Sequence, residues 1–244
     1  MESSRKNPPV RLIRITVEVP TFPNIKTEER LREERRLLGL TSKHMDPASL
    51  VIDLGCGTSY YTGHNAVGID LDKEMLKRAD LKHKILANYN YCPFKDESFG
   101  AVVMCHSLEH TNLPLRPLKE ANRILKKDGV IGVSVPNLRG LHAIWSLLWR
   151  GWLKGIGPYH SDHLTAFTPQ ILRKILCKAG FTVVDEGGDV VYFPLMKRFE
   201  LMKLGYWLAG HFPKWANVYI IIGKTITKRV QSKDYLSLVE KSEK

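Results

Sequence analysis

Short apolar runs recur along the chain, and each has the length of a single strand. Continuous apolar runs of this kind are typical of strands that are covered on both faces of a sheet. The predicted strands are residues 50–52, 66–69, 83–87, 99–105, 130–135, 181–185 and 217–222, with a further short β-rich run at 10–19. Segments with helical spacing lie between several of them, so the pattern predicts a parallel sheet with helices on both faces.

Helix start and stop signals mark the intervening segments. The predicted helices are residues 27–38, 73–79, 114–125 and 168–179. Asp72 and Thr168 stand at N-cap positions, and Pro169 follows as a first helical residue. The third helix is expected to end in a basic turn before Gly129. Helix 27–38 is highly charged with few apolar positions, which fits either a solvated helix or the edge of a substrate lid. We expect the solvated helix.

One strand–turn–strand unit organises the first half of the chain. Strand 50–52 runs into Asp53-Leu54-Gly55-Cys56-Gly57, where two glycines permit a tight turn and close approach of a ligand to the backbone. The following strand ends on Asp70, where a doubly wound sheet places a ribose-binding carboxylate. The third glycine of a dinucleotide-binding turn, which precedes a helix that receives a pyrophosphate, is missing. The unit predicts a pocket for a ribose-containing cofactor.

The motif DLGCGT followed by VGID resembles the nucleotide-binding core of class I S-adenosylmethionine (SAM)-dependent methyltransferases, specifically the type 11-like small-molecule enzymes. Three later segments resemble the same family in the same order: PFKDESFGAVV, which has Gly100 in place of the usual acid; LKKDG, which lacks the usual proline; and HSDHLTAFTPQILRKILCKAGF. The resemblance covers residues 50–180. It implies an α/β fold, a Rossmann-like seven-stranded, mostly parallel sheet with one antiparallel strand near the C-terminus, helices on both faces and a helical cap.

The resemblance also implies SAM as the cofactor and assigns its contacts. The turn residues Asp53, Gly55, Cys56 and Gly57 would enclose the methionine end of SAM, and Leu71 and Tyr89 would pack on its adenine. Asp70 would bind both ribose hydroxyls. Asn88 stands where the family usually has Asp, and its carbonyl would accept a hydrogen bond from the adenine amino group. Cys105 and His106, at the end of strand 99–105, would line the methyl pocket.

The first crossover departs from the family pattern because only residues 58–65 separate the glycine turn from the next strand. A parallel crossover normally takes a dozen or more residues and contains a helix. The segment therefore forms either a helix of about one turn or an irregular loop. Tyr60 and Tyr61 either line the pocket or fill the volume of the missing helix, and we expect them to fill volume.

The candidate catalytic residues follow strand 99–105 in the segment CHSLEH. Methyl transfer to a hydroxyl or protonated amine needs a base, and histidine suits this role near neutral pH. His110 is the predicted base, with Glu109 as its orienting partner and His106 as a second candidate; packing or capping roles for both histidines remain open. His160 and His163 form an HxxH pair that could present two imidazoles to a metal, but without an evident third ligand we expect no metal site. The alternative for this pair is a wall of the active site or a second base.

A tryptophan-rich segment, LHAIWSLLWRGWL at 141–153, has apolar residues on one helical face and basic residues at its flanks. One interpretation is an interfacial helix that lies on an anionic membrane or closes over a lipid-like acceptor. The other is a cap helix that packs on the sheet and walls the substrate pocket, and we expect the cap.

Composition limits the choice of partners. Lys and Arg together number 37 against 25 Asp and Glu, a formal charge of +12. An excess of positive charge favours nucleic acids, anionic membranes or anionic substrates as binding partners. The alternative interpretation is that the charge only keeps a basic enzyme in solution. The cysteines show no disulfide or zinc-ligand spacing, and the sequence has no signal-peptide apolar region or membrane-spanning run. We therefore expect a cytoplasmic protein, with peripheral contact with a membrane as an alternative.

Together these features predict a SAM-dependent methyltransferase that acts on an oxygen or nitrogen of a small-molecule, lipid-linked or glycan acceptor. An RNA methyltransferase is an alternative, although no separate RNA-binding module or NPPY-type motif is evident. A non-catalytic SAM-binding partner subunit is another. The expected organisation is an N-terminal tail and helix at 1–46, a methyltransferase domain at 47–227 with a cap insertion at 139–165, and a polar tail at 228–244.

Overall fold

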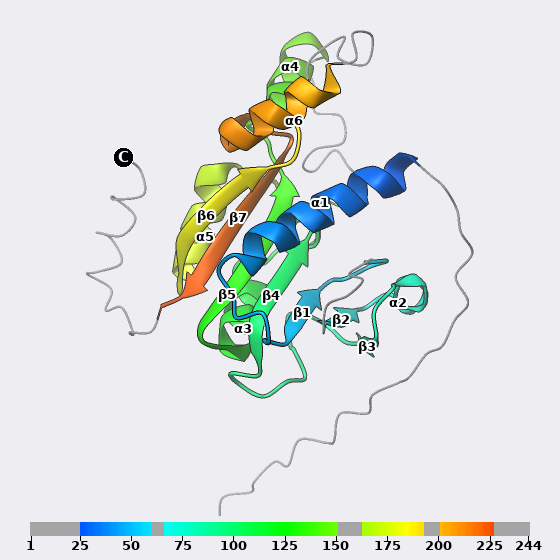
Figure 1. Ribbon diagram of the computed structural model, residues 1–244, viewed down its shortest axis with the longest axis vertical. Coiled ribbons are helices and arrows are strands. Elements are labelled where there is room, and N and C mark those ends of the chain that lie inside the picture. Colours follow the sequence, from blue (N-terminus) through cyan, green and yellow to red (C-terminus); the bar gives the residue numbers. More distant parts are fainter. Residues whose placement is uncertain (1–24, 60–65, 151–162, 193–200, 227–244) are drawn as a thin grey trace, which may run out of the picture.

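The computed structural model describes residues 25–59, 66–150, 163–192 and 201–226 (Figure 1). Its helices are α1 (Ile25–Ser42), α2 (Lys73–Arg78), α3 (Leu115–Ile124), α4 (Leu141–Arg150), α5 (Pro169–Lys178) and α6 (Met202–His211), with short 3-10 helices η1 (Leu108–His110) and η4 (Pro213–Trp215). Its strands are β1 (Val51–Leu54), β2 (Ala66–Asp70), β3 (His83–Leu86), β4 (Phe99–Cys105), β5 (Leu125–Pro136), β6 (Phe181–Gly188) and β7 (Val218–Thr225).

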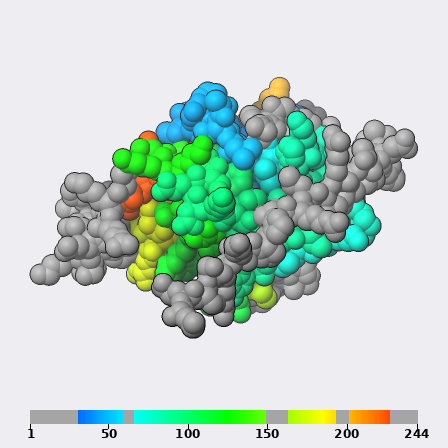
Figure 2. Space-filling view, turned by 90° about the horizontal axis from the view of Figure 1, so that it is seen from below, coloured from blue at the N-terminus to red at the C-terminus, as the bar shows by residue number. Residues whose placement is uncertain are grey.

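The strands form one seven-stranded sheet in the order β3-β2-β1-β4-β5-β7-β6. β7 is antiparallel to β5 and β6, and the other neighbouring pairs are parallel. Seen end-on in Figure 2, the colours follow this order from cyan on one side through green to yellow and orange on the other. The predicted fold is confirmed. The chain turns in opposite directions from β1 and β4, so the crevice beyond their carboxyl ends is where such sheets bind ligands.

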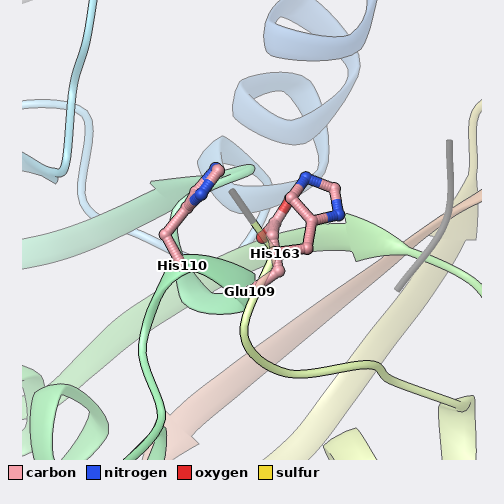
Figure 3. A group of neighbouring side chains, drawn as sticks. All are labelled: Glu109, His110 and His163. Carbon is pink, nitrogen blue, oxygen red and sulfur yellow. The ribbon is translucent and has the colours of Figure 1, made fainter. Parts of the chain in front are cut away.

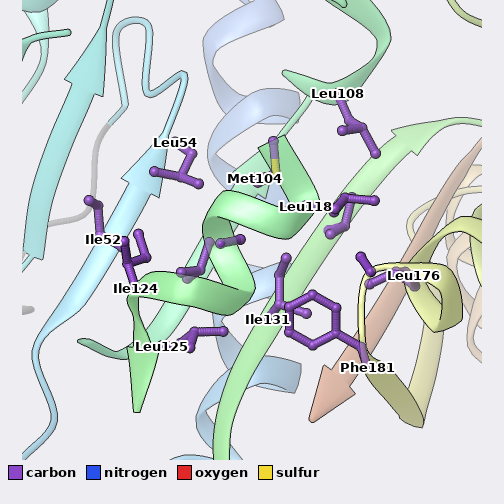
Figure 4. Close-up of a cluster of buried hydrophobic side chains, with 14 of the residues drawn as sticks. Ile52, Leu54, Met104, Leu108, Leu118, Ile124, Leu125, Ile131, Leu176 and Phe181 are labelled. Carbon is purple, nitrogen blue, oxygen red and sulfur yellow. The ribbon is translucent and has the colours of Figure 1, made fainter. Parts of the chain in front are cut away.

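One face of the sheet is covered by α3 and α5. Figure 4 shows the apolar core between these helices and the strands, with Leu118 and Ile124 from α3, Leu176 from α5, and Met104 and Ile131 from the sheet. All five of these side chains are fully buried. The continuous apolar runs in the sequence are thus explained by a sheet that is covered on both faces.

The opposite face is covered by α1, which lies across β4, β5, β6 and β7 (Figure 1). The expectation of a solvated helix was wrong. Leu37 is fully buried, and the polar residues Glu34 and Thr41 are buried beside it. Thr41 satisfies its hydroxyl by donating to the Leu37 carbonyl oxygen at 2.7 Å. A Cβ built on Gly132 of β5 would lie 2.2 Å from Thr41 Oγ1, so this glycine permits the close approach of the helix.

Two of the predicted helix starts are confirmed, whereas the helix that was predicted to begin at Thr27 already includes Ile25. Asp72 caps α2 by accepting hydrogen bonds from the N–H groups of Glu74 and Met75, and Thr168 caps α5 by accepting from Ile171 N–H. The basic turn that was expected to end α3 before Gly129 is not part of that helix. α3 ends at Ile124, and Gly129 lies within the strand β5, which begins at Leu125.

Several predictions fall outside the described residues: the β-rich run at 10–19, Tyr60 and Tyr61 in the first crossover, the segment 151–162 with His160, and the tail from residue 228. The fate of the shortened crossover therefore stays a prediction. None of the helices within the described ranges has the length and apolar character required to cross a bilayer.

Candidate functional site

The glycine turn after β1 has the backbone conformation that its sequence demands. Gly55 and Gly57 have φ angles of 75° and 52°, a region that side-chain-bearing residues rarely adopt. The N–H groups of Gly55 and Cys56 both donate to the Ile69 carbonyl oxygen, at 2.9 and 3.0 Å. A Cβ added to Gly55 would lie only 2.7 Å from Ser107 Cβ. The turn therefore passes directly beside the segment that follows β4.

Asp70 is fixed at the end of β2 by backbone donors. Its Oδ2 accepts from Gly57 N–H and its Oδ1 from Asp72 N–H, both at 2.8 Å. The carboxylate is thus locked onto the glycine turn, and each oxygen keeps a second lone pair. Leu71 follows with 62% of its side chain exposed, which leaves an apolar surface beside the carboxylate.

Tyr89 and Asn88 line the same region from the loop after β3. Tyr89 donates its hydroxyl to the Ser107 carbonyl oxygen at 3.3 Å, and its ring would contact a Cβ at Gly55. Burial raises the pKa of Tyr89 to about 12, so the hydroxyl stays protonated. Asn88 Oδ1 accepts from Asn90 N–H at 2.9 Å, which orients the amide and uses one of its two lone pairs.

Three of the predicted cofactor contacts, Asp53, Cys56 and Cys105, are buried side chains. Cys56 Sγ would lie 2.8 Å from a Cβ on Gly68, so this side chain faces the core. Cys105 Sγ accepts from the Ser134 hydroxyl at 3.4 Å. Burial raises the pKa of both thiols. The backbone of these two cysteines is therefore the part that could border a cofactor, and their assignment stays a prediction.

His106 lies between two carboxylates. Its Nδ1 is 3.1 Å from Glu109 Oε1, and its Nε2 is 2.9 Å from Glu33 Oε2 of α1. Burial opposes the charge, but these two hydrogen bonds raise the pKa of His106 to about 10. An imidazolium with both nitrogens engaged suits a link between α1 and the end of β4 better than a proton acceptor.

Glu109, His110 and His163 gather where η1 meets the segment before α5 (Figure 3). One ligand atom from each lies within 4.8 Å of the others. Glu109 is fully buried and His110 is exposed at the surface of η1. The rings of His110 and His163 meet edge-on at a centroid distance of 5.0 Å. The structure thus brings together the predicted base, its predicted partner and one member of the HxxH pair.

Part of the chain matches a known protein family. Residues 52–133 match the methyltransferase domain family, and this range contains the glycine turn, Asp70 and the cluster on η1. This part of the chain is a methyltransferase domain. A solved SAM-dependent methyltransferase of Archaeoglobus fulgidus has the same fold, with a TM-score of 0.56 at 18% identity over 82% of this chain and 98% of that one.

Two curated relatives match parts of this chain. An uncharacterised Methanocaldococcus jannaschii protein, MJ1252, is 35% identical over 123 residues, 48% of this chain and 49% of the relative. The human protein named mitochondrial arginine-hydroxylase NDUFAF5 is 29% identical over 166 residues, 63% of this chain and 48% of the relative. The chain spans about half the length of these curated relatives.

SAM is the cofactor that this domain family implies, and the residues at the glycine turn fit it. The turn packs closely at Gly55, where a Cβ would lie 2.7 Å from Ser107 Cβ, and Gly57 N–H holds the Asp70 carboxylate beside the turn. Leu71 offers an exposed apolar surface for a base, and Tyr89 closes the turn from the other side. A carboxylate that can accept two hydrogen bonds, held beside a glycine turn, is the arrangement that a ribose diol requires.

Two residues of the candidate site were not identified from the sequence, and a third was identified without its partners. Ser107 contacts both the glycine turn and Tyr89, Glu33 reaches the site from α1, and His163 joins the η1 cluster from far along the chain. The HxxH spacing drew attention to His163, but no sequence signal paired it with Glu109. Glu33 was hidden because helix 27–38 was interpreted as solvated.

Proposed function

We propose that this protein transfers a methyl group from SAM to an oxygen or nitrogen of a small-molecule, lipid-linked or glycan acceptor, with a lipid-linked acceptor favoured. The observation that carries the proposal is the convergence at Ser107. The cofactor turn touches Ser107 directly, and Ser107 immediately precedes η1, which bears Glu109 and His110. The cofactor and the titratable cluster therefore share one edge of the sheet.

SAM supplies an activated methyl group, so the protein has mainly to position the acceptor and exclude water. An acceptor hydroxyl or ammonium must also lose a proton. His110 is exposed at the carboxyl edge, next to the buried carboxylate of Glu109, and is the candidate that accepts this proton. His106 holds α1 against this edge through Glu33 and is a positioning residue.

The preference for a lipid-linked acceptor comes from α4, α6 and η4, which lie together beyond the carboxyl edge of the sheet (Figure 1). Their exposed apolar side chains are Ile144, Leu147, Leu148, Leu204, Trp207, Phe212 and Trp215. Lys203 and Lys214 are exposed on the same two C-terminal elements. Apolar and aromatic residues beside lysines are typical of peripheral contact with an anionic membrane. This surface replaces the simple cap as our interpretation of 141–150.

A second candidate is hydroxylation of an arginine side chain, which the printed name of the human relative suggests for that protein. The match over 63% of this chain favours testing it here. An RNA acceptor is suggested only by the net charge of +12, and a SAM-binding subunit without activity remains the non-catalytic alternative.

The test is transfer of labelled methyl from SAM to cell extract, followed by separation into lipid, small-molecule, protein and RNA fractions. We expect label in lipid, and His110→Ala should slow transfer while SAM affinity stays near that of the wild type. His83→Ala, which replaces a histidine at the start of β3 on the opposite edge, is the control and should transfer normally. Label in RNA alone, or SAM binding without transfer to any fraction, would refute the proposal; a protein product heavier by one oxygen would favour hydroxylation.

The membrane contact has its own test. Addition of phosphatidylserine vesicles should shift tryptophan fluorescence to the blue, and Trp207→Phe with Trp215→Phe should reduce that shift. Neutral phosphatidylcholine vesicles should have less effect, because Lys203 and Lys214 gain nothing from them. An unchanged spectrum with both vesicles would leave α4 and α6 as a cap.

A further inference from the structure

We propose that Glu109, His110 and His163 bind one divalent first-row transition-metal ion. Each residue offers one ligand atom, and these atoms lie within 4.8 Å of one another. Ligands around a tetrahedral or octahedral ion at 2.0–2.2 Å are about 3 Å apart, so closure requires only small side-chain rotations. This inference goes beyond the transfer reaction, because an ion at this place would exist with or without an acceptor.

Main-chain hydrogen bonds hold the two ligand-bearing segments together. The N–H groups of Leu164 and Thr165 both donate to the Glu109 carbonyl oxygen, at 2.8 and 3.0 Å. Thr165 Oγ1 also donates to the Thr111 carbonyl oxygen at 2.6 Å. As a result His163 stands opposite Glu109, with Nε2 4.0 Å from Oε1. The backbone thus preorganises the pair before any ion binds.

The Glu109 carboxylate has the surroundings of a metal ligand. Its side chain is 1% exposed, and Oε1 is oriented by His106 Nδ1 at 3.1 Å. Among the described residues no hydrogen-bond donor reaches Oε2, which is buried. A buried carboxylate oxygen without a donor is unfavourable, and a cation supplies the missing interaction. His106 then acts as the outer partner that fixes the ligand, an arrangement usual around protein metals.

The ligand types select the class of ion. Two imidazoles and one carboxylate suit Zn²⁺, Fe²⁺, Mn²⁺, Co²⁺ or Ni²⁺, whereas Mg²⁺ and Ca²⁺ prefer oxygen donors. Three protein ligands leave at least one coordination position open, and the exposure of His110 places the site at the surface. Such open sites bind substrate or water, whereas structural zinc sites are closed by four protein ligands.

The ion would also change the chemistry of the proposed transfer, and this part rests on the proposed function. An acceptor hydroxyl bound at the open position would lose its proton to solvent more readily, because the cation stabilises the alkoxide. The oxygen would then form its bond to the methyl carbon as the bond from that carbon to sulfur breaks. With the ion bound, His110 is a ligand and no longer the proton acceptor.

The experiment is a titration of chelator-stripped full-length protein with Co²⁺, followed by visible absorption, and with Zn²⁺, followed by calorimetry. We expect one ion per chain. His163→Ala and His110→Ala should each weaken binding at least about tenfold, since even outer-shell changes have effects of that size. His83→Ala is the matched control and should bind as the wild type does. Circular dichroism and SAM binding report whether each variant is folded.

Equal metal affinity in wild type, His163→Ala and His110→Ala would overturn the proposal, as would the absence of binding to the folded wild type. Glu109→Gln gives a further check, because it preserves shape and hydrogen bonds to His106 while removing the anionic ligand. Metal binding that persists without methyl transfer would refute the proposed function and leave the metal site standing. Transfer that is unaffected by chelation would remove the ion from the reaction but not from the protein.

Discussion

Replacement of Gly55 by alanine is the sharpest perturbation of the glycine turn after β1. Gly55 has φ of 75°, where an L-residue with a Cβ is disfavoured by about 1–2 kcal/mol. The new methyl group would lie 2.7 Å from Ser107 Cβ and 3.3 Å from Tyr89 Cε1. Carbon atoms prefer separations of about 3.5–4.0 Å, so one of the two segments must move by about 1 Å.

The expected magnitude follows from these two effects. Overpacking a close-fitting site typically destabilises by about 1–3 kcal/mol, and Ser107 is buried and cannot swing into solvent. Together with the backbone strain, Gly55→Ala should lower the free energy of unfolding by about 2–5 kcal/mol, which for a chain of this size lowers Tm by roughly 4–20 °C. Because the same turn holds Asp70 through Gly57 N–H, displacement of the turn should also lower SAM affinity by at least about tenfold, or 1.4 kcal/mol.

Urea unfolding and calorimetric titration with SAM measure the two effects separately. Gly39→Ala is the control, because a Cβ at this position in α1 would have no atom within 4 Å. In a helix that substitution should raise stability by about 0.5–1 kcal/mol and leave SAM affinity unchanged. If Gly55→Ala unfolds at the wild-type urea concentration and binds SAM equally well, the turn neither contacts Ser107 nor borders the cofactor.

Three further outcomes are expected. Asp70→Ala removes charged hydrogen bonds to the ribose of about 1.5–3 kcal/mol each. Calorimetric titration should therefore show that SAM binds at least about 30-fold more weakly, and an unchanged affinity would exclude the ribose contact. Hydrogen bonds from Arg123 lower the pKa of Glu120 in the folded state. The ionised Glu120 therefore stabilises the fold at pH values above the ordinary glutamate pKa of about 4.5. This stabilisation is lost as the pH falls through the lower pKa of the folded state. Urea unfolding should therefore find Glu120→Gln destabilised by about 1 kcal/mol at neutral pH and equal to wild type in acid, whereas a constant difference would contradict this. Arg32→Ala leaves the buried carboxylate of Asp189 without its bidentate partner and should reduce stability by about 2–4 kcal/mol, whereas Arg32→Met with Asp189→Leu should reduce it less.

The fold was largely predictable because its strands are local apolar runs and its helices carry local caps. The strand 99–105 was predicted with the bounds that the structure has, and the Thr168 cap and Pro169 placed the start of α5. The role of α1 was not predictable from the same evidence. Its few apolar residues resemble those of a solvated helix, and only the sheet that it crosses shows why Leu37 is fully buried.

The candidate site was also predictable only in part. The glycine turn and Asp70 lie close in sequence, so their spacing was informative, and the structure brings them into contact. The pairing of Glu109 with His163 depends on main-chain hydrogen bonds between segments more than fifty residues apart. No local pattern encodes such a contact. The HxxH spacing directed attention to His160 and His163 as a pair, whereas the partners of His163 in the structure are Glu109 and His110.

The position of α1 bears on how the chain reaches its native state. The helix lies early in the sequence, yet its Arg32 binds Asp189, which is 157 positions further along the chain. Its docking surface on β6 and β7 does not exist until nearly all of the described chain has been synthesised. Until then one apolar face of the nascent sheet is uncovered, and closing so long a loop is slow. Such an intermediate is prone to aggregate, so we expect refolding yield to fall with protein concentration and to improve when a chaperone covers that face.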